Sequence, residues 1–289
     1  MGYQTFKHRT PLPIFANVPP KLRPIAQNPQ WSLTEYVCSA GPHDRTFEER
    51  HDRVSMAVVT SGTFRYRTDT GEGILYPGAF LLGNAGSCYE CGHEHSHGDR
   101  CLALHIDREL FGEIAAGSSG SNRCGFRTAV LPAVPALASI SVSLHLASLP
   151  QPKLALEETI LTAIETVARA VGTNHRCPRR LKAAAIRRMT VAIDYIESRF
   201  ANDLSLAELS AYVGISKYHF LRTFKQASGM TPHQYVLGRR LRTAAAALRA
   251  TRKPVARIAL DHGFGDLSTF NHLFGRVMGS TPTTYRSSS

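Results

Sequence analysis

One stretch near the C-terminus decides the fold, GFGDLSTFNHLFGRVMGSTPTTYR, which runs from Gly263 to Arg286. It repeats the pattern of SLAELSAYVGISKYHFLRTFKQASGMTPHQY, from Ser205 to Tyr235. Because chance agreement over so many positions is improbable, the chain uses one supersecondary unit twice. The matched residues lie fifty positions apart: Ser216 with Asp266, Phe220 with Phe270, Phe224 with Phe274, Gly229 with Gly279, Pro232 with Pro282, and Tyr235 with Tyr285.

The first unit is predicted to be two helices joined by a tight turn. A short apolar-periodic run over 204–213 ends at Gly214, and glycine accepts the left-handed conformation that ends helices. Ser216 is a good N-cap for the next helix. In that helix Phe220 and Phe224 lie one turn apart, so both face a core. This order of elements is that of a helix-turn-helix.

The second unit follows the same order. Its turn, Gly263 to Gly265, is one residue longer, and Asp266 is the expected N-cap of its second helix. An Ala-, Leu- and Arg-rich stretch from Pro232 to Ala250 predicts a helix that links the two units. Thr231 and Thr281 each precede a proline, which favours an N-cap followed by proline at the first helical position.

The outer faces of the two second helices carry side chains of the kinds that read DNA. Arginine can reach guanine and asparagine can reach adenine, while lysine and hydroxyl groups hold phosphate. From residue 181 onward the chain has 16 Lys or Arg against 6 Asp or Glu, out of a net charge of +12, which favours a polyanionic partner. A plain helical bundle, the alternative, would need only the phenylalanine core. The candidate DNA-binding residues are Lys217, Tyr218, Leu221, Arg222 and Lys225 on the first helix, and Ser268, Thr269, Asn271, His272 and Arg276 on the second.

Over about the last third of the chain these stretches resemble the DNA-binding domain of the AraC/XylS family of transcription regulators. The resemblance implies two recognition helices set into successive major-groove segments of double-stranded DNA at an operator or promoter, with RNA polymerase as a further partner. His272 stands where such proteins often carry Arg, and Gly275 where they often carry Lys. The first helix, with Arg222 and Lys225, is therefore expected to be the better anchor.

Residues 31–105 are predicted to be rich in β-strands. Short apolar or alternating runs such as 54–60 and 63–67 are separated by turns at Ser61-Gly62 and Pro77-Gly78. Strands at this spacing suggest a small barrel or jelly roll. The segment YPGAFLLGNAG, from Tyr76 to Gly86, resembles the cupin-like effector domain of many AraC-type regulators, which implies that this part senses a small effector.

The expected fold class is α+β with two domains: a cupin-like β-barrel with following helices, and an all-α double helix-turn-helix domain. An apolar stripe from Leu154 to Val171 predicts a helix, for which packing onto the barrel and a homodimer interface both stay open. The expected divisions are an N-terminal extension (1–30), an effector domain (31–135), a helical dimerisation or packing segment (136–173), a linker (174–180) and the DNA-binding domain (181–289).

The cellular compartment is expected to be the cytoplasm. No stretch approaches the roughly 20 apolar residues that a membrane span needs, and no apolar region typical of a secretion signal follows Lys7, His8 and Arg9. No membrane partner is expected. The six cysteines are then expected to be reduced thiols or metal ligands rather than disulfides.

The segment CYECGHEHSHGDRC, from Cys88 to Cys101, concentrates thiols and imidazoles, the preferred ligands of zinc and related transition metals. In an extended backbone Cys91, His93, His95 and His97 share one face, and Cys101 or His51 from a neighbouring strand could complete a tetrahedral site. Ligands at i and i+2 are, however, about 6–7 Å apart, which is awkward for one ion. A structural role or an organic-ligand role therefore stays open. The candidate metal ligands are Cys88, Cys91, His93, His95, His97 and Cys101.

Three classes of function are compatible with these patterns. A regulator that binds DNA and senses an effector is the leading hypothesis. An enzyme, such as a metal cupin dioxygenase, is disfavoured because two histidines and one carboxylate with open positions are not recognisable across His51, Glu90 and 93–97. A nonspecific nucleic-acid protein would explain the charge, but it would not use a duplicated pair of recognition helices.

Overall fold

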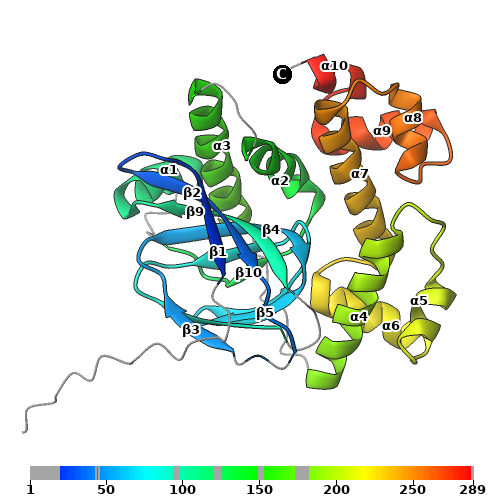
Figure 1. Cartoon of the computed structure of the whole chain (residues 1–289), viewed down its shortest axis with the longest axis horizontal. Coiled ribbons are helices and arrows are strands. Elements are labelled where there is room, and N and C mark those ends of the chain that lie inside the picture. The colour runs from blue at the N-terminus through cyan, green and yellow to red at the C-terminus, as the bar shows by residue number, and fades with distance from the viewer. Residues whose placement is uncertain are drawn as a thin grey trace, which may run out of the picture.

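The structure, a computed structural model, describes residues 20–42, 44, 46–93, 98–119, 125–148, 153–172 and 182–287. It has two parts: a β-sheet part with three covering helices, and a helical part that begins at residue 183 (Figure 1). The prediction of a mixed two-domain chain with a helical C-terminal region is confirmed.

The strands form two antiparallel sheets. A six-stranded sheet has the order β1-β2-β9-β4-β7-β10, and a four-stranded sheet has the order β3-β8-β5-β6. Within the described residues the two sheets do not close into one barrel, so the predicted barrel is not confirmed. The strands are β1 (Lys21–Gln27), β2 (Trp31–Cys38), β3 (Phe47–Arg50), β4 (Val54–Gly62), β5 (Phe64–Thr68), β6 (Gly71–Leu75), β7 (Phe80–Gly83), β8 (Cys88–Gly92), β9 (Asp99–Ile106) and β10 (Val130–Leu131).

The large sheet buries both of its faces, and the two-residue period of a strand divides its side chains between them. On β4 and β9, Ala57 and Ala103 face the core shared with the small sheet. Their neighbours Met56 and Leu104 belong to a second core on the other face. Strand β1 lies within the expected N-terminal extension and pairs with β2.

Three helices cover the second face of the large sheet: α1 (Arg108–Ser119), α2 (Pro135–Ala147) and α3 (Lys153–Gly172). On α3, Ile160, Ile164 and Val167 are fully buried in that core, whereas Leu154 and Leu161 are exposed. Most of the predicted apolar stripe is thus used for packing within the chain. None of the helices in the described part of the chain is long and apolar enough to cross a membrane.

The helical part contains both predicted helix-turn-helix units and the linking helix between them. Ser216 Oγ accepts the backbone N–H of His219, and Asp266 Oδ1 accepts that of Thr269 at 2.7 Å, so both predicted N-caps are confirmed. The turn of the second unit is one residue longer, as predicted. The helices are α4 (Ala183–Arg199), α5 (Leu206–Tyr212), α6 (Lys217–Ser228), α7 (Pro232–Ala250), α8 (Val255–Asp261), α9 (Leu267–Met278) and α10 (Pro282–Ser287).

The β-sheet part contacts both helix-turn-helix units. At one end, the Tyr76 hydroxyl donates to the carbonyl of Ser228, the last residue of α6, at 2.6 Å. Near the middle, the buried guanidinium of Arg242 on α7 donates to the carbonyl of Pro77 at 2.9 Å. At the other end, α2 lies against α7 and α9 (Figure 1). The relative position of the two units therefore depends on the β-sheet part as well as on α7.

A substitution in the turn at Pro77-Gly78 tests this interface. Gly78 has φ +89°, and a Cβ atom there would lie 2.6 Å from Cζ of Arg242. We expect Gly78→Ala to lower the free energy of unfolding by about 1–3 kcal/mol, because it combines backbone strain with a steric clash. Gly117, exposed on α1 with no atom near its Cβ position, provides the control.

Gly117→Ala should be neutral, or stabilising by up to about 1 kcal/mol. Urea unfolding of both variants measures the difference. Equal stability of the two variants would contradict a tight contact between Gly78 and Arg242.

Candidate nucleic-acid interface and a pocket between the sheets

Helices α6 and α9 each bury one face and expose the other. Phe220 and Phe224 of α6, and Phe270 and Phe274 of α9, have no exposed surface. The second phenylalanine of each pair packs against a tyrosine that follows the left-handed glycine cap: Phe224 against Tyr235, and Phe274 against Tyr285. Because the aromatic pairs fix the rotation of each helix, they also determine which side chains face solvent.

Nine of the ten candidate DNA-binding residues are exposed, and Leu221 is half-buried. Among the large hydrophobic side chains of the described residues, Tyr218 is the most exposed, with 74% of its surface open to solvent. Sequence reasoning missed His219, which is also exposed on α6. His219 lies between the N-cap Ser216 and Phe220, so a helical projection of every position after the cap identifies it as exposed.

The cationic side chains on the recognition helices are not neutralised by acidic partners. Within the described residues no acidic side chain pairs with Lys217, Arg222, Lys225 or Arg276. Elsewhere in the helical part, Arg239 pairs with Glu197 at 2.7 Å. The unpaired charges on α6 and α9 therefore leave a positive potential over both recognition helices.

Arg240 on α7 ties the two units together. Its guanidinium donates three hydrogen bonds of 2.7 Å, one from each nitrogen, to backbone carbonyls. The acceptors are Phe200 and Asn202, which precede the first unit, and Gly263, in the turn of the second. The backbone comes this close because position 263 is glycine: a Cβ there would lie 2.4 Å from the carbonyl oxygen of Ala201.

A pocket lies between the two sheets. Alternate residues of β9 and β2 point into it, and the small side chains of Ala57 and Ala103 leave room at its centre. The wall mixes apolar groups with histidine, tyrosine and thiol groups, a composition that suits a small ligand with a few polar groups. The lining residues are Pro20, Tyr36, Cys38, Glu49, His51, Ser55, Ala57, Phe64, Leu81, Tyr89, Cys91, His93, Asp99, Cys101, Ala103 and His105.

Two histidines of the pocket are held by hydroxyl groups. His51 Nε2 lies 2.8 Å from the Tyr66 hydroxyl oxygen, and the ring of His51 stacks on the ring of Tyr89. The ring of His105 contacts Tyr36 and Ser55, at 3.1 and 3.0 Å. Desolvation by burial, joined by the charge of His105, lowers the pKa of His51 to about 4.

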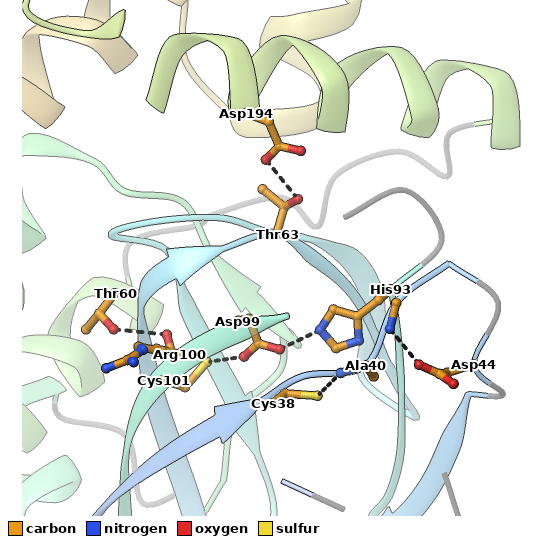
Figure 2. Close-up of polar contacts among 11 residues, drawn as sticks. Cys38, Ala40, Asp44, Thr60, Thr63, His93, Asp99, Arg100, Cys101 and Asp194 are labelled. Carbon is orange, nitrogen blue, oxygen red and sulfur yellow. Dashed lines mark hydrogen bonds and ion pairs between the residues drawn. The ribbon is translucent and has the colours of Figure 1, made fainter. Parts of the chain in front are cut away.

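At one end of the pocket, four side chains form a buried polar cluster (Figure 2). His93 Nε2 lies 2.5 Å from Asp99 Oδ1, and the Cys101 thiol donates to the other carboxylate oxygen at 3.2 Å. Cys38 lies opposite Asp99 on the neighbouring strand, and its sulfur accepts the backbone N–H of Ala40 at 3.5 Å. Burial alone would lower the pKa of His93, but hydrogen bonds with Asp99 and Cys38 raise it to about 9.

The predicted metal ligands are therefore only partly brought together. Cys91, His93 and Cys101 line the pocket, whereas Cys88 is exposed and is not among the lining residues. His95 and His97 lie outside the described residues.

Sequence reasoning missed Cys38 and Asp99. Asp99 lies inside the Cys88–Cys101 segment, but the prediction there rests on thiols and imidazoles alone. Cys38 reaches the cluster through strand pairing, which the sequence does not reveal.

The residues that a metal cupin enzyme would use are not assembled. Glu90 forms ion pairs with Arg65 and Arg67, at 3.7 and 3.2 Å, and does not line the pocket. His51 contacts Tyr66 and Tyr89 instead of a carboxylate. Across the described residues, His51, Glu90 and His93 therefore do not form a two-histidine, one-carboxylate site.

Comparison with known proteins finds similarity in the helical part of the chain. A family described as a helix-turn-helix domain matches residues 209–288. The chain is 37% identical over 98 residues to the probable transcriptional regulator LumQ of Photobacterium leiognathi, and 38% identical over 95 residues to the transcriptional regulator Rob of Salmonella typhimurium. These matches cover 34% and 33% of this chain, and 40% and 33% of the two relatives.

A solved structure covers a similar stretch. It is a transcriptional regulator of Chromobacterium violaceum, described among AraC-type DNA-binding domain-containing proteins. It is 30% identical to this chain, with a TM-score of 0.34, and the match covers 37% of this chain and 95% of that structure.

The hydrogen bonds of Arg240 lead to a prediction about stability. Lysine keeps the charge but cannot present a planar fork to three separate carbonyls. We expect Arg240→Lys to lower the free energy of unfolding by about 1–3 kcal/mol, because half-buried carbonyls lose their donors. Arg187→Lys, at an exposed position of α4, is the matched control and should leave stability within about 0.5 kcal/mol of wild type. A loss no larger than that of the control would mean that Arg240 does not hold the units together.

The buried His51 ring predicts a dependence of stability on pH. The unfolded chain, with a histidine pKa of about 6.5, takes up this proton before the folded chain, with a pKa of about 4. The contribution of His51 to the free energy of unfolding is therefore fully present above about pH 6.5. Up to about 3 kcal/mol of it is lost as the pH falls toward 4.

His51→Gln keeps a polar group near Tyr66 but removes the titration, so its stability should fall less steeply over this range. Urea unfolding at several pH values compares the two proteins. Parallel curves for wild type and variant would exclude His51 as the source.

Proposed function

The C-terminal part of the chain belongs to the AraC type of helix-turn-helix domains, and from this premise we propose that the protein is a sequence-specific DNA-binding regulator of transcription. The observation that carries the proposal is the pair of capped recognition helices, each fixed by a buried phenylalanine pair and each exposing unpaired cationic side chains. Such helices can enter successive major-groove segments of double-stranded DNA.

Helix α6 is the stronger reader in this proposal. Arg222 is exposed in the middle of the helix and can make two hydrogen bonds to a guanine, while Lys217 and Lys225 can hold phosphates. On α9, Asn271 can read adenine, and Ser268, Thr269 and His272 can contact the backbone or base edges. Arg276 adds a single cation near the end of that helix.

The β-sheet part is proposed to be a cupin-like sensor of a small effector. Its pocket has the mixed wall that small ligands need, and its surface contacts both helix-turn-helix units. An effector that binds more tightly to one arrangement of the two parts would shift the population toward that arrangement and change the affinity for DNA. The effector acts through the contacts at Tyr76, Pro77 and α2.

A homodimer and a contact with RNA polymerase stay predictions. The stripe of α3 is mostly buried within the chain, so a dimer contact through this helix would have to use exposed residues such as Leu154 and Leu161. Light scattering of wild type and of a Leu154→Ser, Leu161→Ser double variant tests this. A dimer that persists in the double variant would have to use another surface.

Binding to random DNA, followed by sequencing of the bound fraction, tests the proposed function. Full-length protein should enrich a motif that extends over two neighbouring turns of the helix, about 10 base pairs apart centre to centre. A nonspecific nucleic-acid protein would instead bind every sequence with an affinity set by salt alone. Absence of enrichment would therefore exclude the regulator and favour the nonspecific alternative.

With that motif in hand, Arg222→Ala should weaken binding by about 1–3 kcal/mol and relax the preference at one base position. Lys225→Ala should weaken binding to all sequences alike and reduce the salt dependence by about one counterion. The control is Arg108→Ala, which removes an exposed arginine from α1 of the β-sheet part. If Arg222→Ala and Arg108→Ala bind the motif equally well, Arg222 is not a base-reading residue.

A further inference from the structure

The polar cluster at the end of the pocket gathers thiol, imidazole and carboxylate groups, which are the kinds of ligand that zinc binds. Ligand atoms of Cys38, His93 and Asp99 all lie within 4.8 Å of one another. All three side chains are buried, with exposed fractions of 9%, 6% and 8%. The thiol of Cys101, 3.2 Å from Asp99 Oδ2, stands beside them.

Strand pairing explains why the donors converge. Cys38 ends β2 and Asp99 begins β9, and the two residues are partners in the antiparallel register. Cys101 follows two residues later, so it shares the face of Asp99. His93 comes from the other sheet, just after β8, and reaches Asp99 across the pocket (Figure 2).

The spacing and chemistry of this set fit a tetrahedral transition-metal ion. Zinc binds sulfur at about 2.3 Å and nitrogen or oxygen at about 2.0–2.2 Å, so its ligands lie about 3–4 Å from one another. A small outward movement of the ring or carboxylate, now 2.5 Å apart, would accommodate the ion. A mixture of thiol, imidazole and carboxylate disfavours magnesium and calcium, which prefer oxygen alone.

The environment of Cys38 also suits a metal-bound thiolate. Its sulfur already accepts the backbone N–H of Ala40, a contact that stabilises negative charge on sulfur. The competing explanation is a buried ion pair between His93 and Asp99 that needs no metal. That pair extends to both thiols, because Cys101 donates to Asp99 and Cys38 is hydrogen-bonded to His93. The two explanations involve the same four side chains and differ in the uptake of metal.

We propose that Cys38, His93 and Asp99, with Cys101 as the neighbouring thiol, form a zinc site at the end of the pocket. This set replaces the sequence-based expectation of a site along the Cys88–Cys101 segment: Cys38 and Asp99 enter it, and the exposed Cys88 leaves it. The site itself does not rest on the proposed function, because it is defined by donors within the β-sheet part.

The position of the site connects it to the helical part. Asp99 pairs with Gly62 on β4, and the backbone packs so closely there that a Cβ on Gly62 would lie 2.2 Å from the carbonyl oxygen of Gly98. The next residue, Thr63, donates to Asp194 of α4 at 3.4 Å. Gly62, the strand partner of Asp99, directly precedes Thr63 in the chain. A metal bound to Asp99 therefore lies close to a contact between the two parts (Figure 2). Any effect on DNA binding, unlike the site, rests on the proposed function.

Titration of the reduced, metal-free full-length chain with Co²⁺ tests the site without DNA. Cobalt is the spectroscopic substitute for zinc, and thiolate ligation gives an intense charge-transfer band in the near ultraviolet. We expect one equivalent to produce this band, together with the strong visible bands of tetrahedral cobalt. Added Zn²⁺ should abolish both. Elemental analysis of protein purified without chelators should find about one zinc per chain.

Two variants and a matched control locate the ligands. Cys38→Ser should remove or strongly reduce the charge-transfer band and weaken zinc binding by more than about tenfold, a loss seen even for groups that only orient a ligand. Asp99→Asn should weaken binding while keeping the thiolate band. Cys88→Ser, at the exposed cysteine of β8, should match wild type in both measurements.

The wild-type titration is decisive even if Cys38→Ser fails to fold. Folded wild-type protein that gives no thiolate band and takes up no zinc would overturn the proposal and leave His93 and Asp99 as a buried ion pair. Equal losses in Cys88→Ser and Cys38→Ser would also overturn it. Failure of the DNA-selection experiment would leave these results unaffected, because the titration contains metal and protein alone.

Discussion

The arrangement of the helical part depends on Arg240 in the linking helix. One guanidinium donates to carbonyls of the segment that leads into the first helix-turn-helix unit and to a carbonyl in the turn of the second unit. Hydrogen bonds to backbone groups fix position more strictly than apolar packing, because their strength falls steeply with distance and angle. The recognition helices can thus be presented as one rigid surface, although each unit is a short pair of helices that could not bury a core alone.

The β-sheet part adds a second constraint at the same helix. Arg242, two residues along α7, is buried against the turn at Pro77-Gly78, while Tyr76 reaches the end of α6 and α2 covers α9. The pocket opens between the sheets that carry these contacts. A ligand in the pocket is therefore separated from the recognition helices by only a few residues of strand and turn, which is the contact path that the proposed effector response uses.

The sequence predicted the helical part well and the pocket poorly, for a physical reason. Caps, glycine turns and the spacing of Phe220 and Phe224 are local signals, and duplication let each unit verify the other. Strands β4 and β5 also lie near their predicted bounds, although Ser61 and Gly62, which were expected to form a turn, belong to β4. Pairing of Cys38 with Asp99, and the path of Arg240 to three carbonyls, depend on residues far apart in the chain. Such contacts leave no mark on local composition or periodicity.

The differences between the two helix-turn-helix units have a consequence for the DNA of the proposed regulator. The second turn is one residue longer than the first, although the matched buried phenylalanine pairs keep the corresponding faces of α6 and α9 exposed. Their exposed side chains also differ, with three unpaired cations on α6 and one on α9. A single chain then lacks internal twofold symmetry, and the sequence it reads has a direction. Reversing such a sequence beside a gene would turn the β-sheet part, and whatever it contacts, to the opposite end of the site.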